Sequence, residues 1–553
     1  MVGVSRLELL TSRSQSARAT NCAKPRINIL YHICYDMYMR SFVEKYKRPL
    51  TLIAPALIGG LYLILCLVSV QQTIWFDESY TAYIIRFNYT DIVRYTAVDV
   101  HPPLYYLLVK TWSLIFGYSD FALRAMSALL GAIAILFAFL WLKYKYGKTA
   151  AILGSLFLAL SPNFIRYGEE MRMYTLVAAI VFAATYILQL AIDNKERKWW
   201  IIYAVLVVLG MYTHYFTAFV WIAHVVYLLM IYKKKFFTKK YFATYLLAAA
   251  LYIPWIPGFI KQSTSVQNGF WIGETNVEKV ANFFTETVLY ENVAKTANWL
   301  LVLFIATCAL FIYLSWRYRK QLKLLLCMAI IPVVGLILIS MPPLKPMFVP
   351  RYVLYSMCAM ALMVGVELTL LARDLAAKVP KKKKAKNDYR KPAVIMTLCI
   401  LVFVGSSIWG IGQVYAKTNY NFENGSQPIA KQVFYDTITL AGDEVIPIIA
   451  ETEWIYLDMV FYSSDEHPVY FLDERTENKQ GTLLPLAEHD FGKIKDLNQF
   501  LEEHPKVIYV GQPKTGNKVL EFPREGYTQS SLLVMGHDDN SGNKFQAAIY
   551  EKE

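Results

Sequence analysis

The chain has 553 residues, of which 56% are hydrophobic and only 18% are charged, and its mean hydropathy is +0.33. A soluble domain of this size needs far less apolar surface, so the composition excludes an ordinary soluble globular protein and places most of the chain in lipid. The formal net charge of +14 does not indicate a nucleic-acid partner, because the Lys and Arg residues cluster between apolar segments, as in the cytoplasmic loops of membrane proteins.

Residues 1–48 form an N-terminal segment of separate character. Up to about residue 36 it is basic and Ser-rich, and it lacks the apolar core, roughly 7–15 residues long, of a signal peptide. We expect this segment to be cytoplasmic and disordered, with Met37 or Met39 as alternative translation starts.

Apolar runs long enough to cross a membrane recur through residues 49–415. Crossing about 30 Å of hydrocarbon takes roughly 20 apolar residues, and the runs predict an α-helical polytopic membrane domain with about eleven spans. The approximate spans are 50–70, 121–142, 149–163, 173–192, 199–213, 216–232, 241–260, 298–316, 323–341, 351–371 and 393–413.

The basic clusters, from "KYKRP" before the first span to "PKKKKAKNDYRK" at 380, all fall on one side of these spans. The positive-inside rule makes that side cytoplasmic. Polar residues that are distant in sequence therefore share the extracytoplasmic face. These residues are Asp77, Glu78, His101, Glu169, Glu170, Arg172, His214 and Arg351.

The outer loop 71–120 carries "WFDESYTAY" and a turn, "DVHPP", between stretches with apolar residues at helical spacing. These stretches are too short to span and too apolar for open water, so we expect amphipathic helices in the interface. Such helices would wall a cavity between Asp77 and His101. The alternative is that Asp77 only caps the first helix. We expect the longest outer loop, 261–297, to act as a lid over the site.

Residues 416–553 differ in composition from the membrane domain. Short apolar runs such as "EVIPIIA" and "KVIYV" alternate with helix-like stretches such as "IKDLNQFLEE", a pattern typical of a small α/β domain. The stretch "MGHDDNSGN" lacks the glycine spacing of a dinucleotide phosphate site. We expect an extracytoplasmic α/β domain and assign no chemistry to it.

Five short motifs of the membrane domain resemble a known family. They are "DES" at 77, "HPPLYYLLVKTW…FGYSDFALR" at 101–124, "YGEEMRMYTL" at 167, "YTHYF" at 212 and "PRYVLYS" at 350. In order and sidedness they resemble membrane glycosyltransferases of the GT-C class, in particular protein O-mannosyltransferases and the aminoarabinose transferases of lipid A. The resemblance implies a GT-C-like cell-membrane enzyme that moves a mannose-like hexose from a polyprenyl-phosphate carrier to an extracytoplasmic acceptor, with inversion.

The resemblance places the catalytic role on Asp77, as the general base that takes the proton of the acceptor hydroxyl. Glu78, the second acid of the motif, would hold Asp77 in place or contact the sugar or a helix end. Inverting transfer uses direct displacement, so no carboxylate nucleophile is expected.

The remaining candidates would bind the donor or the acceptor. Arg351 offers a planar fork for the leaving phosphate, and the alternative for it is an arginine that reaches toward the interface. Glu170 matches a second acidic site of the family, against the alternative of exposed local ion pairs worth under about 1 kcal/mol each. The predicted substrate-binding residues are His101, Glu170, Arg172, Tyr174, Arg351 and Tyr352.

A divalent metal is an open alternative, because some relatives hold one and His214 is a candidate ligand. However, Val100 stands where aminoarabinose-type enzymes carry a glutamate, and Asp99 is only its neighbour. His214 would otherwise bind phosphate or simply pack.

The implied partners are a polyprenyl-phosphate-linked sugar, the bilayer, and a protein, lipid or glycan acceptor, and no nucleic acid. A transporter or flippase for a lipid-linked sugar is the alternative function. Transporters usually show paired repeats and ionisable groups near the bilayer midplane, whereas the acids and histidines noted here cluster at one surface. A membrane-anchored sensor or assembly factor would leave the charged outer loops unexplained.

Overall fold

The fold is taken from a computed structural model. It describes residues 53–68, 73–194, 196–233, 239–268, 272–292, 296–377, 390–416, 430–472, 481–513, 520–535 and 545–553. The N-terminal segment 1–48, for which we predict disorder, lies outside these residues.

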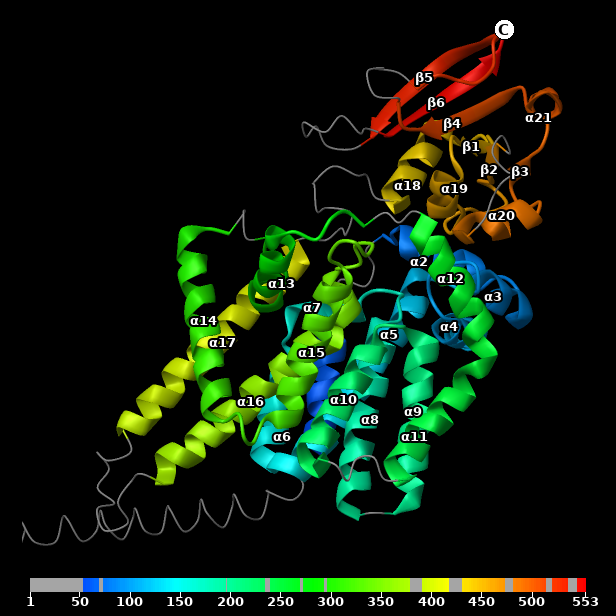
Figure 1. The fold of residues 1–553 in the computed structure, drawn as a ribbon. Helices are drawn as coiled ribbons and strands as arrows, with labels where there is room; N and C mark the ends of the chain where they lie inside the picture. Colours follow the sequence, from blue (N-terminus) through cyan, green and yellow to red (C-terminus); the bar gives the residue numbers. More distant parts are fainter. Residues whose placement is uncertain are drawn as a thin grey trace, which may run out of the picture. The chain divides into compact units, whose positions relative to one another are not determined.

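A helix or a bent helix pair lies over each predicted span (Figure 1). Among the described residues, six helices are long and apolar enough to cross a membrane, or up to seven if the bent pair α6 and α7 counts as one span. The helices over the spans are an apolar helix at Ile53–Leu67, α5 Asp120–Tyr146, α6 Lys148–Ala159, α7 Pro162–Gly168, α8 Tyr174–Asn194, α9 Arg197–Thr213, α10 Thr217–Tyr232, α11 Lys239–Tyr252, α14 Asn298–Arg317, α15 Lys323–Ile339, α16 Leu354–Ala377 and α17 Arg390–Ala416.

Local signals account for the ends of α5. The side chain of Ser119 accepts a hydrogen bond from the backbone N–H of Ala122 at the start of the helix, as an N-cap residue does. Gly147, with φ of 93°, ends the helix and leads directly into α6. Because glycine adopts this conformation without strain, the chain reverses between two membrane helices with a single residue.

The helix pair α6 and α7 bends by 63°. Pro162 stands at the first turn of α7, where a proline is tolerated because its missing N–H has no helical partner. The hydroxyl of Tyr62 donates to the carbonyl of Phe164 at 3.0 Å and ties α7 to the first apolar helix. The bend directs the chain into the turn 169–173, which carries the predicted site residues Glu170 and Arg172.

Three short helices occupy the outer loop 71–120, where amphipathic helices were expected. They are α2 Phe76–Ile84, α3 Tyr89–Thr96 and α4 Leu104–Phe116. The turn with His101 lies between α3 and α4. Trp75, before α2, donates its backbone N–H to the carboxylate of Glu78 at 3.3 Å. The acid that caps α2 is therefore Glu78, and this leaves Asp77 for another role.

The predicted lid 261–297 is largely helical. The helix α12, Ile256–Asn268, continues α11 through a short 3₁₀ turn at Ile253–Trp255, and α13 spans Val277–Leu289. The outer segment expected as a lid therefore contains helices, and its role as a lid stays a prediction.

The C-terminal residues form an α/β domain, as predicted. Its six-stranded sheet has the order β3-β2-β1-β4-β6-β5, with β1 to β4 parallel and β6 antiparallel to both β4 and β5. The elements are α18 Ala430–Ala441, β1 Ile448–Ala450, α19 Glu453–Val460, β2 Val469–Leu472, α20 Leu484–Glu488, β3 Lys493–Ile494, α21 Leu497–Glu503, β4 Lys506–Gly511, β5 Tyr527–Met535 and β6 Phe545–Lys552.

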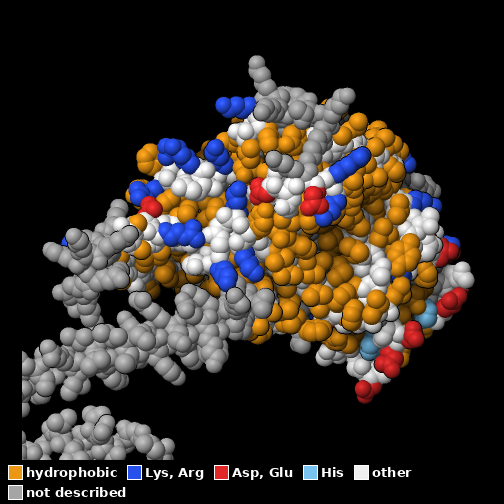
Figure 2. Space-filling model, turned by 90° about the horizontal axis from the view of Figure 1, so that it is seen from below, with side chains coloured by type: hydrophobic (Ala, Val, Ile, Leu, Met, Phe, Trp, Pro, Cys, Tyr) orange, Lys and Arg blue, Asp and Glu red, His pale blue; other side chains and the backbone are white. Residues whose placement is uncertain are grey.

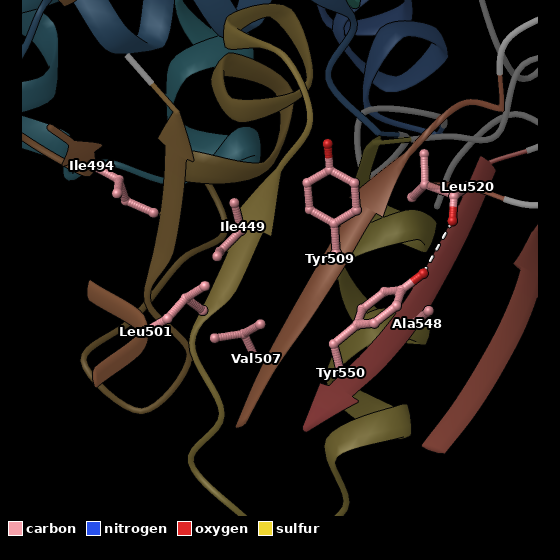
Figure 3. Close-up of a cluster of buried hydrophobic side chains, with 8 residues drawn as sticks. All are labelled: Ile449, Ile494, Leu501, Val507, Tyr509, Leu520, Ala548 and Tyr550. Carbon is pink, nitrogen blue, oxygen red and sulfur yellow. Dashed lines mark hydrogen bonds between the residues drawn. The ribbon is translucent and has the colours of Figure 1, made fainter. Parts of the chain in front are cut away.

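This domain has a hydrophobic core of its own (Figure 3). Val507 and Ala548, on the neighbouring strands β4 and β6, contribute to a buried cluster together with Ile449 of β1. The hydroxyl of Tyr550 in this cluster donates to the carbonyl of Leu520 at 3.0 Å (Figure 3). The buried polar atom is thus satisfied, as buried polar groups generally are.

The surface of the membrane domain is largely hydrophobic on one face (Figure 2). Figure 2 shows a broad hydrophobic face, with Lys and Arg side chains distributed over part of it. Basic residues occupy the last turns of α5 and α14, at Lys143, Lys145 and Arg317. This distribution is typical of helices that end at a lipid headgroup layer.

Candidate functional site

Asp77 is the second residue of α2, and its carboxylate lies between two arginines. The Oδ2 atom is 3.7 Å from Nη2 of Arg172 and 3.8 Å from Nη2 of Arg351. The side chain of Asp77 remains 24% exposed, whereas those of Arg172 and Arg351 are 3% and 16% exposed. An accessible carboxylate between two guanidinium groups is an arrangement that binds an anion and accepts a proton at neighbouring points.

The adjacent acid, Glu78, points into the protein. Its side chain is fully buried and receives hydrogen bonds from Nε and Nη2 of Arg124 at 2.8 and 2.5 Å. The backbone N–H of Met171 donates to it at 2.7 Å. Glu78 therefore joins α2 to α5 and to the turn 169–173, and its contacts are with protein groups. Arg124, which completes this pair, was not among the residues predicted from the sequence.

Arg172 also binds the helix α2. Its Nη1 atom donates to the carbonyl of Asp77 at 3.1 Å and to the hydroxyl of Thr81 at 3.2 Å. A third, longer bond of 3.4 Å reaches the hydroxyl of Tyr106 in α4. The arginine thus combines a structural contact with the backbone of α2 and an electrostatic contact with the Asp77 carboxylate.

Trp75 contacts both Arg351 and Glu170. The guanidinium of Arg351 lies over the indole ring at 5.2 Å from its centroid, a cation–π contact. The indole Nε1 donates to Oε1 of Glu170 at 2.7 Å, and Oε2 of Glu170 is 3.3 Å from Arg166. Burial raises the pKa of Glu170, and Arg166 partly offsets this effect. The contact between Glu170 and Arg166 is buried, so the alternative of an exposed ion pair for Glu170 is wrong.

His101 and His214 come together beside Tyr352. The imidazole centroids are 5.4 Å apart, and the ring of His214 is 5.2 Å from that of Tyr352. Burial lowers the pKa of His214 to about 3 and that of His101 well below its usual value, with Arg172 adding to both effects. Both rings are therefore neutral near pH 7. Within the described chain, Nε2 of His214 is buried without a hydrogen-bond partner.

Tyr174 closes this side of the site. Its ring packs edge-on against Tyr167 at 5.1 Å and lies 6.1 Å from His214. Its hydroxyl has no hydrogen-bond partner among the described residues and is buried. A neutral hydroxyl and a neutral imidazole with free polar atoms are groups that recognise sugar hydroxyls or phosphate oxygens.

A network that the sequence analysis did not identify holds the turn with His101. The side-chain amide of Gln262, in α12, donates to the carbonyls of Thr96 and His101 at 2.5 and 3.1 Å. Tyr215 donates to the Oε1 atom of Gln262 and accepts a bond from Trp255. The helix α12 thus contacts the turn with His101 through Gln262.

The site residues fit a metal held by protein ligands poorly. Among the described residues, no group of three His, Cys, Asp or Glu side chains is placed to hold a metal ion. His214 lies beside the second imidazole of His101, while Asp99 accepts a hydrogen bond from Thr482 at 2.8 Å. Metals with imidazole ligands usually take a carboxylate or thiolate as well, so we assign no mechanistic step to a metal.

An apolar cavity of about 460 Å³ lies among α6, α7 and α13 to α17. Its lining includes Pro162 at the start of α7 and Met357, six residues after Arg351 in the chain. Phe157, Phe284, Phe311 and Phe403 contribute aromatic surface. The lining is mainly hydrophobic and suits a hydrocarbon chain.

Comparison with known proteins supports the fold. Residues 100–257 match the family described as dolichyl-phosphate-mannose-protein mannosyltransferase. This segment contains the motifs with His101, Glu170 and His214, but neither "DES" nor "PRY". No curated protein matches the chain in sequence.

The fold is similar to that of ArnT from Cupriavidus metallidurans bound to undecaprenyl phosphate, with a TM-score of 0.55 and 15% identity over 90% of this chain and 97% of that one. For ArnT from the same organism in the apo state, the TM-score is 0.56, with 14% identity over 89% of this chain and 97% of that one. An oligosaccharyltransferase from Archaeoglobus fulgidus, tethered with an acceptor peptide, has a TM-score of 0.49 and 14% identity over 78% of this chain and 64% of that one. The predicted fold class, and the predicted resemblance to GT-C proteins, are thereby confirmed.

Proposed function

We propose that this multi-pass membrane protein, which has the GT-C fold, is a glycosyltransferase that moves a sugar from a polyprenyl-phosphate carrier to an acceptor hydroxyl. The observation that carries the proposal is the accessible carboxylate of Asp77 held between Arg172 and Arg351. Transfer from a phosphate needs a base for the acceptor and cations for the leaving group, and this arrangement supplies both. A mannose-like hexose as the sugar, and the extracytoplasmic face of the cell membrane as the location, are parts of this proposal.

The reaction is a single displacement with inversion. The acceptor oxygen forms a bond to the anomeric carbon and gives its proton to the Asp77 carboxylate. The bond between that carbon and the phosphate oxygen breaks, and the oxygen keeps the electron pair. Arg351 and Arg172 stabilise the negative charge that develops on the phosphate. Glu78 positions α2 through Arg124, while His101, Glu170, Tyr174 and Tyr352 bind the sugar and the phosphate.

The apolar cavity supports the lipid part of the proposed donor. A prenyl chain gains little from leaving lipid, but a preformed apolar channel orients the phosphate without exposing the chain to water. ArnT, whose fold is similar, has been crystallised with undecaprenyl phosphate. We propose that the carrier's prenyl chain occupies this cavity, with its phosphate near Arg351.

One observation favours the alternative of a transporter. Glu367, within α16, is fully buried and accepts a hydrogen bond from Ser315 at 2.6 Å. Ionisable groups inside a span often belong to transport pathways. Movement of a fluorescent lipid-linked sugar across proteoliposomes, with wild type and Glu367→Gln, tests this alternative.

The transferase proposal is tested with purified protein, polyprenyl-phosphate-linked hexoses and candidate hydroxyl acceptors. We expect Asp77→Asn to lower kcat by about 100-fold or more, because loss of a general base costs roughly 10²–10⁴-fold. The matched control is Asp443→Asn, which changes an exposed aspartate. Full transfer by a folded Asp77→Asn protein would show that Asp77 is not the base.

A further inference from the structure

The C-terminal domain contacts the helix that carries Asp77. Oγ of Ser79, in α2, donates to Oδ1 of Asp458, in α19, at 2.8 Å. The backbone N–H of Ile74 donates to the hydroxyl of Tyr462 at 3.1 Å, and the ring of Phe76 packs edge-on against Trp454 at 4.8 Å. These contacts join the α/β domain to the first turn of α2.

The Ser79–Asp458 contact lies on the side of α2 that faces away from the arginines. Successive residues of a helix are separated by about 100°, so Ser79 points roughly 160° away from Asp77 around the axis. Arg172 donates a hydrogen bond to the carbonyl of Asp77 at 3.1 Å. On the opposite side of the helix, Asp458 accepts a hydrogen bond from Ser79. A helix of only nine residues is thus fixed between the membrane domain and the C-terminal domain.

An aspartate is an unfavourable residue for simple packing at this point. Ser79 is 1% exposed, and Asp458 itself is only partly accessible. Burial raises the pKa of Asp458 to about 7, and the Ser79 hydroxyl only partly offsets this effect. Because a carboxyl held partly out of water costs free energy that an apolar side chain would not, its presence favours a directional role over general adhesion between the domains.

We propose that Asp458 is a positioning residue, which acts through its hydrogen bond with Ser79 to hold α2 in the orientation that presents Asp77 to the acceptor. The inference rests on the proposed transferase function and extends it to the C-terminal domain. Asp458 touches no reacting atom. Its effect is on the placement of the base, where a displacement of about 1 Å can cost roughly 100-fold in rate.

The experiment measures kcat and KM for donor and acceptor in four variants of the full chain. Ser79→Ala removes the donor, Asp458→Leu removes the acceptor, and Asp458→Asn keeps an acceptor oxygen. We expect the first two to lower kcat by about 10–100-fold with KM changed less than about twofold, and Asp458→Asn to remain near wild type. The double variant Ser79→Ala/Asp458→Leu should be no slower than either single variant, because both break one bond.

The matched control is Asp465→Asn, an exposed aspartate of the same domain, which should leave kcat unchanged. Thermal melting in detergent identifies variants whose fold has changed, and Ser79→Ala and Asp458→Asn are mild enough to keep the test decisive. Wild-type kcat in folded Ser79→Ala and Asp458→Leu proteins, or multiplicative losses in the double variant, would overturn the inference alone. A wild-type protein that transfers no sugar would instead overturn the proposed function, and the inference with it.

Discussion

Asp77 and Glu78 are neighbours in sequence but lie in different environments. Asp77 is partly accessible between two arginines at 3.7 and 3.8 Å, whereas Glu78 is fully buried against Arg124. A helix turns by about 100° per residue, so adjacent side chains on α2 leave the helix in different directions. One acid is thereby available for chemistry, and the other holds the helix in place.

Because the two acids have different surroundings, we expect Glu78→Gln to lower stability and Asp77→Asn to lower activity. Glu78→Gln leaves the buried guanidinium of Arg124 without its carboxylate, and breaking such a pair costs about 3–5 kcal/mol. We expect a clear fall in melting temperature in detergent for Glu78→Gln and little change for Asp77→Asn, which instead loses transfer activity. An unchanged melting temperature for Glu78→Gln would contradict the structural role assigned to this acid.

At the scale of elements, the close crossing of α6 and α16 holds the membrane domain together beneath the site. A Cβ added at Gly365 of α16 would lie 2.1 Å from the backbone nitrogen of Gly154 in α6. The two helices approach backbone to backbone, as small residues allow in membranes. The 3₁₀ turn Pro350–Val353 at the start of α16 carries Arg351, so this crossing helps to fix where that arginine lies.

Gly365→Ala should therefore destabilise the protein, because the new methyl group meets backbone atoms that cannot move aside. Overpacking of this kind costs about 1–3 kcal/mol, seen as a lower melting temperature in detergent. Gly405→Ala, in α17, is the control, since a Cβ there has nothing within 4 Å, and alanine favours a helix by up to about 1 kcal/mol. Equal melting temperatures for the two variants would argue against the close crossing.

At the scale of the whole molecule, the buried imidazoles link stability to pH. His101 and His214 are 7% and 3% exposed, and the burial that lowers their pKa values keeps them neutral in the folded protein. In the unfolded chain a histidine titrates near pH 6.5. Below about pH 6.5, and for His214 down to its folded pKa of about 3, the unfolded state therefore binds protons that the folded state does not, and stability falls as the pH falls.

For wild type we expect the melting temperature in detergent to drop as the pH is lowered from about 7 to 4. Each buried histidine contributes up to about 1.4 kcal/mol per pH unit in this window. His214→Gln, which cannot take up the proton, should have a shallower dependence on pH than wild type. Parallel curves for wild type and His214→Gln would show that His214 does not stay neutral in the fold.

Much of the membrane domain follows from the sequence alone. The length of an apolar run and the sidedness of basic clusters are local properties, because they depend on each segment's transfer into lipid and hardly on its neighbours. A helix accordingly lies over every predicted span. The motif residues Asp77, Arg172 and Arg351 do come together, and so do His101 and His214.

The tertiary structure decided what each of these residues does. The partners of Glu78, Ser79 and the turn with His101 lie 46, 379 and 161 residues away in the chain. No local pattern singles out Asp458 or Gln262, because each is an ordinary polar residue until folding removes it from water and gives it a partner. The sequence alone determined which segments form long apolar helices, because apolarity is a property of each segment, and the packing of distant helices determined which carboxylate stays accessible.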